Sequence, residues 1–429
     1  MKKPIAIAVG LIALSGPACL QAAKAPEKGG YVSREEYEKL KQDFEHMKAL
    51  MKEMEKRLAQ QPARGATHDE VAEVREELKT VKREAATAKQ QAKALIPGMR
   101  KFVLTGYGFA GFKNTERTHS SFNAGFNPIF LWRINDRIFF EGEVELELED
   151  DHTNANLEYA QISYLFNDYL TFGAGKFLNP TNYFMERLHP AWINKLPDQP
   201  LSIAASNRIQ AKTLLGGQVR GAVPLRLLGL SGGRVGYAFY AANGPQMQND
   251  GSLKFKNFSG NNSSPSVGGR IGLVPLAGLE VGYGFELGRV RDPFASSSRD
   301  VTTHVVDASY VKTYQAILGQ IALYGQWSWR NVENSSGLGF DNEINGGYGQ
   351  VAYRPSLAEL RWIKNLEGVF RFDRLNQPNG SAFYDENRYT IGMNYYFNPT
   401  TLFKFAYEFD DRSGAKDDDA LLFQVATGF

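Results

Sequence analysis

The sequence of 429 residues contains one cysteine, Cys19, and no long apolar segment beyond its first two dozen residues. A single cysteine excludes a disulfide framework and a cysteine metal cluster. The lack of a run of about 18 uncharged apolar residues excludes helical membrane spans. It does not exclude a transmembrane β-barrel, because alternating strands average to polar in a hydropathy window. The net charge of +2 gives no bulk basic field for nucleic acid.

Motifs of catalysis are also missing. The sequence has no GxSxG elbow, no HExxH and no P-loop. Its histidines show no metal-ligand spacing; they are His46, His68, His119, His152, His189 and His304. We therefore expect no enzyme activity, no cofactor and no metal site.

Residues 1–23 have the pattern of an export signal. Lys2 and Lys3 precede the apolar run IAIAVGLIALSG, and small residues lead to Ala22 and Ala23. This is a charged segment, an apolar segment and a small-residue cleavage site. We predict cleavage after Ala22 or Ala23. A lipoprotein site at Cys19 is the alternative, but the preceding Gly-Pro-Ala lacks the usual leucine.

Residues 24–98 form a second region, in which apolar residues recur at spacings of three and four. A Pro-Gly pair at 97–98 ends the pattern. These helices have no core of their own, so they must pair within the chain as a hairpin or between chains as a coiled coil. We favour a periplasmic coiled coil between chains; a solvated helical spacer is the alternative. The first seam consists of Tyr37, Leu40, Phe44, Met47, Met51, Met54 and Leu58.

Residues 99–429 show strand periodicity instead. The last ten residues, ALLFQVATGF, alternate apolar and other residues and end on the aromatic Phe429. Short turns alternate with eight longer connections, for example 150–156 and 178–206. Eight such connections predict about sixteen strands in an all-β, transmembrane antiparallel β-barrel. Fourteen or eighteen strands, or a soluble β-sandwich, are the alternatives.

The connection 178–206 is too apolar for a loop in water, since it contains Phe184, Met185, Leu188, Ile193 and Leu196. We interpret it as a loop that folds into the channel and narrows the channel. A loop over the barrel rim or in a subunit contact is the alternative. The candidate constriction residues are Tyr183, Glu186, Arg187, His189, Trp192 and Lys195.

Charged residues alternate with apolar ones along the predicted strands. A row of carboxylates at a spacing of two shares one face, which would be costly against lipid and is therefore expected to face the lumen. The row either pairs with basic lumen residues or sets selectivity, and opposed rows would orient dipolar or anionic solutes. The row is Glu141, Glu143, Glu145 and Glu147; the basic candidates are Arg133, Arg220, Arg234, Arg270, Arg330, Arg354, Arg371, Arg388 and Lys404.

The run GEVELELEDDHTNANLEYAQISYLFNDYLTFGAGKFLNPTNY, residues 142–183, resembles the phosphate-selective porin O and P family and its coiled-coil-bearing, dicarboxylate-type relatives. The most specific step is Gly175, Phe177 and Pro180, which leads into the constriction loop. The resemblance implies a trimeric, sixteen-strand porin for small anions. The loop differs from the phosphate branch in carrying only Arg187 and Lys195 as basic residues.

These observations predict a porin in the outer membrane of a Gram-negative bacterium, with its N-terminal region in the periplasm. The expected partners are outer-membrane lipid, two further copies in a homotrimer, small anionic or polar solutes and, as a further candidate, peptidoglycan. A different class of function is also consistent with the sequence. The barrel would then be structural, and its coiled coil would tether the outer membrane to the cell wall.

Overall fold

The computed structural model describes residues 101–429, except 118–119, 150–151, 231, 256–264 and 336. The predicted signal peptide, residues 1–23, and coiled-coil region, residues 24–98, lie outside the described residues. Within the described part of the chain, no helix has both the length and the apolar character needed to cross a membrane.

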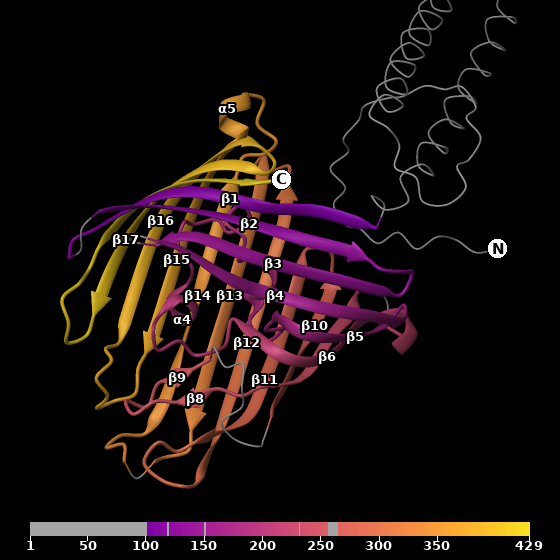
Figure 1. Cartoon of the computed structure of the whole chain (residues 1–429). Coiled ribbons are helices and arrows are strands. Elements are labelled where there is room, and N and C mark those ends of the chain that lie inside the picture. The colour runs from indigo at the N-terminus through magenta and orange to yellow at the C-terminus, as the bar shows by residue number, and fades with distance from the viewer. Residues whose placement is uncertain (1–100, 118–119, 150–151, 231, 256–264, 336) are drawn as a thin grey trace, which may run out of the picture. The chain divides into compact units, whose positions relative to one another are not determined.

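Sixteen antiparallel strands form one closed barrel, as predicted (Figure 1). Each strand pairs with its sequence neighbours in the barrel, and the last strand pairs with the first. The barrel strands are β1 (Phe102–Thr115), β2 (Ser121–Arg133), β3 (Ile138–Glu149), β4 (His152–Asn167), β5 (Leu170–Leu178), β6 (Thr213–Pro224), β7 (Arg234–Ala242), β10 (Ser266–Leu276), β11 (Leu279–Arg291), β12 (Ser298–Tyr314), β13 (Gly319–Val332), β14 (Asn342–Arg354), β15 (Leu366–Asn376), β16 (Glu386–Asn398), β17 (Thr401–Arg412) and β18 (Ala420–Gly428).

The C-terminal strand closes the ring. Its pairing with β1 runs from Tyr107 opposite Gly428 to Thr115 opposite Ala420. The amide of Phe429 donates to the carbonyl of Gly106 at 3.0 Å, and the reverse bond measures 3.3 Å. Gly106 has φ +150°, and a Cβ there would lie 2.3 Å from the carbonyl oxygen of Asn127. Only glycine fits this closing position.

The two faces of the barrel differ in polarity. Along β17, Lys404, Glu408 and Asp410 point inward and are buried, whereas the intervening Phe405 and Phe409 point outward. This follows from the two-residue period of a strand. The soluble-sandwich alternative would bury the apolar faces against one another, whereas here they lie on the outside of a closed barrel.

The connections are mostly short at one end of the barrel and mostly longer at the other. At the first end, 225–233 and 355–365 are exceptions, since they contain the 3₁₀ helix η2 (Leu225–Leu228) and helix α5 (Arg361–Lys364). At the opposite end, residues 243–265 include a small two-stranded sheet, β8 (Gln246–Met247) and β9 (Leu253–Lys254). The predicted long connection at 150–156 is wrong, because β4 already begins at His152.

Candidate functional site

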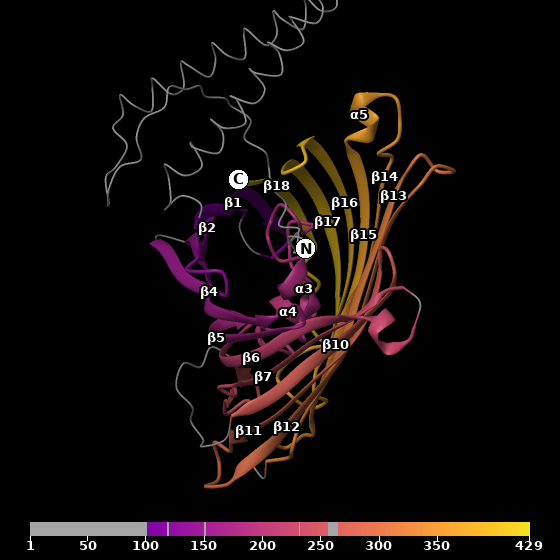
Figure 2. The same ribbon diagram turned by 90° about the vertical axis from the view of Figure 1, so that its right-hand side faces the viewer.

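The connection between β5 and β6, residues 179–212, folds into the barrel. It contains helices α3 (Tyr183–Arg187) and α4 (Leu201–Ala204), and Figure 2 shows both within the ring of strands. The side chain of Asn182 caps α3 by accepting a hydrogen bond from the amide of Met185. We call this segment the inner loop. It is longer than the predicted 178–206, because β6 begins only at Thr213.

Apolar residues of the inner loop pack against the barrel wall. Phe184 and Met185 are almost fully buried beside Tyr348 of β14. Leu196 packs against Ala406 and its neighbours, and Trp192 packs beside Leu402 and Ala426. These contacts explain the high apolar content of the segment, since burying such side chains stabilises the fold by about 1.5–3 kcal/mol each.

Three of the predicted basic lumen residues hold the inner loop by hydrogen bonds to its carbonyl groups. Lys404 donates to the carbonyls of Ala191 and Leu196, and it also donates to Gln424 at 2.8 Å. Arg371 donates to the carbonyl of Asp198 at 2.9 Å. Arg330 donates to the carbonyl of Arg208 at 2.8 Å. All three cations are buried, so they act as anchors of the loop in this structure.

Ion pairs add further links between the loop and the wall. Glu186 on α3 pairs with Arg220 of β6 at 2.5 Å, and Lys195 pairs with Glu367 of β15 at 2.6 Å. Burial alone would raise the pKa of Glu186, but the guanidinium groups of Arg220 and Arg187 outweigh it and hold this pKa below its usual range.

The neighbouring contacts of α3 involve both charge signs. Arg187 lies 3.6 Å from Glu280, and Arg270 pairs with Glu280 at 2.9 Å and with Asp307 at 2.6 Å. The guanidinium of Arg270 also lies 5.4 Å from the ring centre of Tyr183. The charge of Arg270 is thus opposed by two carboxylates at close range.

Arg388 is paired entirely within the wall. It contacts Asp410 at 2.5 Å, Glu386 at 3.1 Å and Glu408 at 3.3 Å. This cluster continues to the inner loop through Lys113 of β1, which lies 3.8 Å from Glu408 and pairs with Asp198 at 2.6 Å. Lys113 and Asp198 were not among the predicted site residues, since nothing in either local pattern signals a partner 85 positions away.

Three predicted lumen arginines lie at strand ends, beside the short turns. Arg133 pairs with Asp136 of the following turn at 2.6 Å, and its side chain is 51% exposed. Arg234 is exposed at the first position of β7. Arg354 lies over the ring of Tyr396, 4.1 Å from its centre. Arg133 and Arg234 therefore lie at the ends of their strands, where both side chains are exposed, and their position along the channel stays a prediction.

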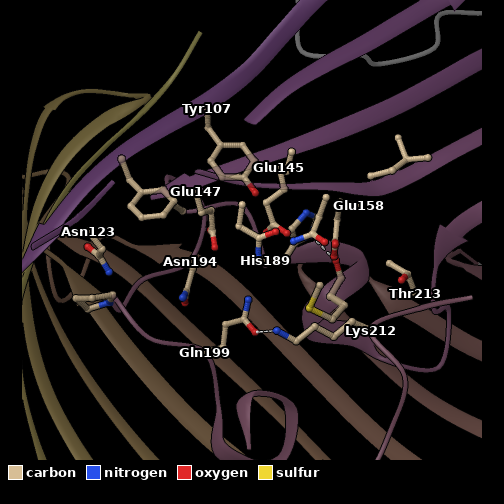
Figure 3. Close-up of a pocket in the computed structure, with 18 of the residues that line it drawn as sticks. Tyr107, Asn123, Glu145, Glu147, Glu158, His189, Asn194, Gln199, Lys212 and Thr213 are labelled. Atoms are coloured by element: carbon tan, nitrogen blue, oxygen red, sulfur yellow. Dashed lines mark hydrogen bonds between the residues drawn. The ribbon is translucent and has the colours of Figure 1, made fainter. Parts of the chain in front are cut away.

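An open cavity of ≈ 700 Å³ lies between the inner loop and the first strands of the barrel (Figure 3). Its acidic border includes Glu145 and Glu147 of β3 and Glu158 of β4. The inner loop borders it with Arg208 and Lys212. Other lining residues include Tyr107, His189, Asn194, Gln199 and Lys176.

The predicted acidic row divides into two parts. Glu141 accepts a hydrogen bond from Gln161 at 2.6 Å, and buried Glu143 lies 3.5 Å from Nε2 of His189. Glu145 and Glu147 border the open cavity instead. The row therefore does face inward, but only part of it reaches the open space.

The basic border of the cavity comes from the end of the inner loop. Lys212 donates to Gln199 at 2.6 Å. Burial lowers the pKa of Lys212, and the neighbouring charge of Arg208 lowers it further, while Glu158 and other carboxylates raise it. Sequence analysis missed both basic residues, because they lie beyond the predicted end of the loop.

No protein-family model matches the chain, and no curated protein matches it. Solved structures do match. OmpF of Salmonella typhi, solved in complex with daunomycin, aligns at 14% identity and a TM-score of 0.53, covering 76% of this chain and 97% of that one. The outer membrane channel DcaP of Acinetobacter baumannii aligns at 14% identity and a TM-score of 0.52, with the same coverage. The barrel has the fold of outer-membrane porins.

Proposed function

We propose that the protein is an outer-membrane porin, a water-filled channel for passive diffusion of small hydrophilic solutes. The observation that carries this proposal is the inner loop, held inside a closed sixteen-strand barrel beside an open, charged cavity. A barrel of this size has room for an aqueous channel, and a loop folded inside it narrows the path. The apolar outer face supports a location in lipid.

The solutes proposed are small and charged, with anions included. An anionic group would face Arg208 and Lys212, and a cationic group of the same solute would face Glu145, Glu147 and Glu158. Arg270, Arg371 and Arg388 contribute less, because carboxylates of the barrel wall already oppose them. Net preference for anions stays a prediction that depends on the cavity residues.

Homotrimer formation, the periplasmic position of residues 24–98 and a link to peptidoglycan belong to the same proposal. They are supported by the sequence resemblance and by the heptad pattern. The structural tether remains the second candidate function, because that pattern continues far beyond what a channel needs.

Single-channel recording of the purified full-length protein in a planar bilayer tests the proposal. We expect conductance steps in groups of three and a non-zero reversal potential under a salt gradient. An anion-selective reversal potential would support the proposed solute class, whereas a cation-selective one would assign selectivity to the acidic border. Folded protein that inserts but never conducts would overturn the channel proposal.

A further inference from the structure

Four neighbouring connections at one end of the barrel expose apolar side chains. They join β6 to β7, β10 to β11, β12 to β13 and β14 to β15, which are consecutive around the ring, and the first and last of them contain η2 and α5. Turn residues are usually Gly, Pro, Asn, Asp and Ser. Here Trp362 on α5 is 58% exposed, and α5 protrudes from the barrel in both views (Figures 1 and 2). We define the apolar rim as Leu227, Leu230, Leu276, Ile317, Leu318, Leu357, Leu360 and Trp362, all exposed.

Hydrogen bonds join the 315–318 turn to the end of β14 and to the connection that follows it. The amide of Leu357 donates to the carbonyl of Leu318 at 2.9 Å, and the hydroxyl of Tyr353 donates to the carbonyl of Ile317 at 2.6 Å. Leu318 adopts φ +49°, a left-handed conformation that is costly for a residue with a Cβ. The structure thus fixes an exposed leucine at a position that ordinarily favours glycine.

Basic residues accompany the apolar rim. Arg226, Lys312, Arg361 and Lys364 are all exposed, and Arg234 follows the first turn. Among the described residues, no ion pair involves any of these five side chains, and the only acidic residue on the four turns is Glu359. The ammonium of Lys312 lies 5.2 Å from the ring centre of Tyr314. This part of the surface is therefore both apolar and positively charged.

Such a combination is typical of a membrane interface, where aromatic side chains lie at headgroup level and Lys and Arg contact phosphates. The apolar rim also continues the outward face of β14, on which Val351 and Tyr353 are exposed. We infer that the apolar rim binds the lipid leaflet at this end of the barrel, with its basic residues contacting anionic phospholipid headgroups. This inference depends on the proposed location in a membrane.

Brominated acyl chains, which quench nearby tryptophan fluorescence, provide the test. The full-length protein and its Trp362→Phe variant are reconstituted in brominated phosphatidylcholine, with and without phosphatidylglycerol. The difference between the two proteins isolates the signal of Trp362. We expect this signal to be quenched, and more strongly when phosphatidylglycerol is present.

Charge variants then show whether the quenching of Trp362 reflects binding of anionic headgroups or only the depth of Trp362 in the bilayer. Combined Arg226→Gln, Arg361→Gln and Lys364→Gln substitutions should abolish the extra quenching with phosphatidylglycerol. Arg291→Gln with Arg374→Gln is the matched control, because both arginines are exposed near the opposite end of the barrel. The control should behave as the unmodified protein.

Two further tryptophans distinguish the possible failures. Trp132 and Trp329 are exposed on strands, so they report insertion of the barrel itself. If they are quenched while Trp362 is not, the rim faces solvent or a protein partner and the inference is overturned. If none is quenched, the barrel is not in the bilayer, and the proposed function fails together with the inference.

Discussion

Three carboxylates on the open cavity are the side chains most directly placed to affect permeating ions. Glu145, Glu147 and Glu158 border the space through which a solute would pass. Replacing Glu147 and Glu158 with Gln should lower cation permeability relative to anion permeability by a factor of about two to five. That factor corresponds to about 0.5–1 kcal/mol, typical of unit charges at close range in water.

The reversal potential under a salt gradient measures this change. Glu141→Gln is the matched control on the same row, because Glu141 is hydrogen-bonded to Gln161. A shift of equal size in the control would mean that the cavity is not the selective part of the channel.

Lys212 predicts a pH dependence of selectivity. Burial first, and then the charge of Arg208, lower its pKa from the usual value of about 10.4. A lysine loses its positive charge as pH rises through its pKa. Anion permeability should therefore begin to fall at a pH below the usual lysine pKa. Recording reversal potentials from about neutral pH to about pH 10 would show the decline.

Lys212→Arg separates this effect from other titrations. Arginine keeps its charge over the whole range, so the variant should retain the anion permeability seen at neutral pH. If the variant shows the same decline as the unmodified channel, another group is responsible.

At the scale of elements, the inner loop depends on side chains of the opposite wall. Lys404→Met removes the donor to the carbonyls of Ala191 and Leu196. Each buried carbonyl left without a partner costs about 1–3 kcal/mol. We therefore expect a lower thermal midpoint and a noisier, larger single-channel conductance, because residues 191–196 lose their attachment.

Lys416→Met serves as the control for that substitution, since Lys416 is exposed on the connection before β18. It should leave both the midpoint and the current noise unchanged. A Lys404→Met channel with unchanged conductance would show that packing alone holds the loop in place.

The strands could be predicted from sequence because the physical cause is local. An outward face such as Phe403, Phe405 and Phe409 repeats every two residues, and this period identifies β17 without knowledge of its neighbours. The inner loop could also be predicted, because its apolar residues need burial. The end of the loop was predicted less accurately, since nothing local marks Thr213 as the start of β6.

The partners of charged side chains could not be predicted in the same way. Alternation shows that Lys404 points inward, but two of its acceptors, the carbonyls of Ala191 and Leu196, lie more than 200 positions earlier in the chain. Glu158 lies at an irregularity in the β3–β4 register, between the pairs Glu143–Tyr159 and Val144–Leu157. A bulge adds a residue to one strand, so the two-residue period no longer assigns its face there.

At the scale of the whole molecule, barrel closure joins the two ends of the described chain. The hydroxyl of Thr105 donates to the carbonyl of Phe429 across 324 positions. Contacts of such separation form slowly, because loop closure must precede them. The ring nevertheless closes using only described residues from Phe102 onward.

That independence leads to a prediction that separates the two candidate functions. Deleting residues 31–95, with the export signal retained, should leave single-channel conductance unchanged, because the barrel and its inner loop remain intact. If the protein acts only as a channel, cells that carry the deletion should also keep a normal envelope, measured as resistance to detergent. Loss of envelope integrity with unchanged conductance would assign a tether function to the N-terminal region beside the channel.

Substituting Leu40 and Met47 with Asn disrupts the heptad seam without shortening the chain. This variant therefore tests whether the tether function depends on pairing of the helices rather than on their length. Loss of conductance on deletion, with folded barrel in the membrane, would contradict the independence of the pore.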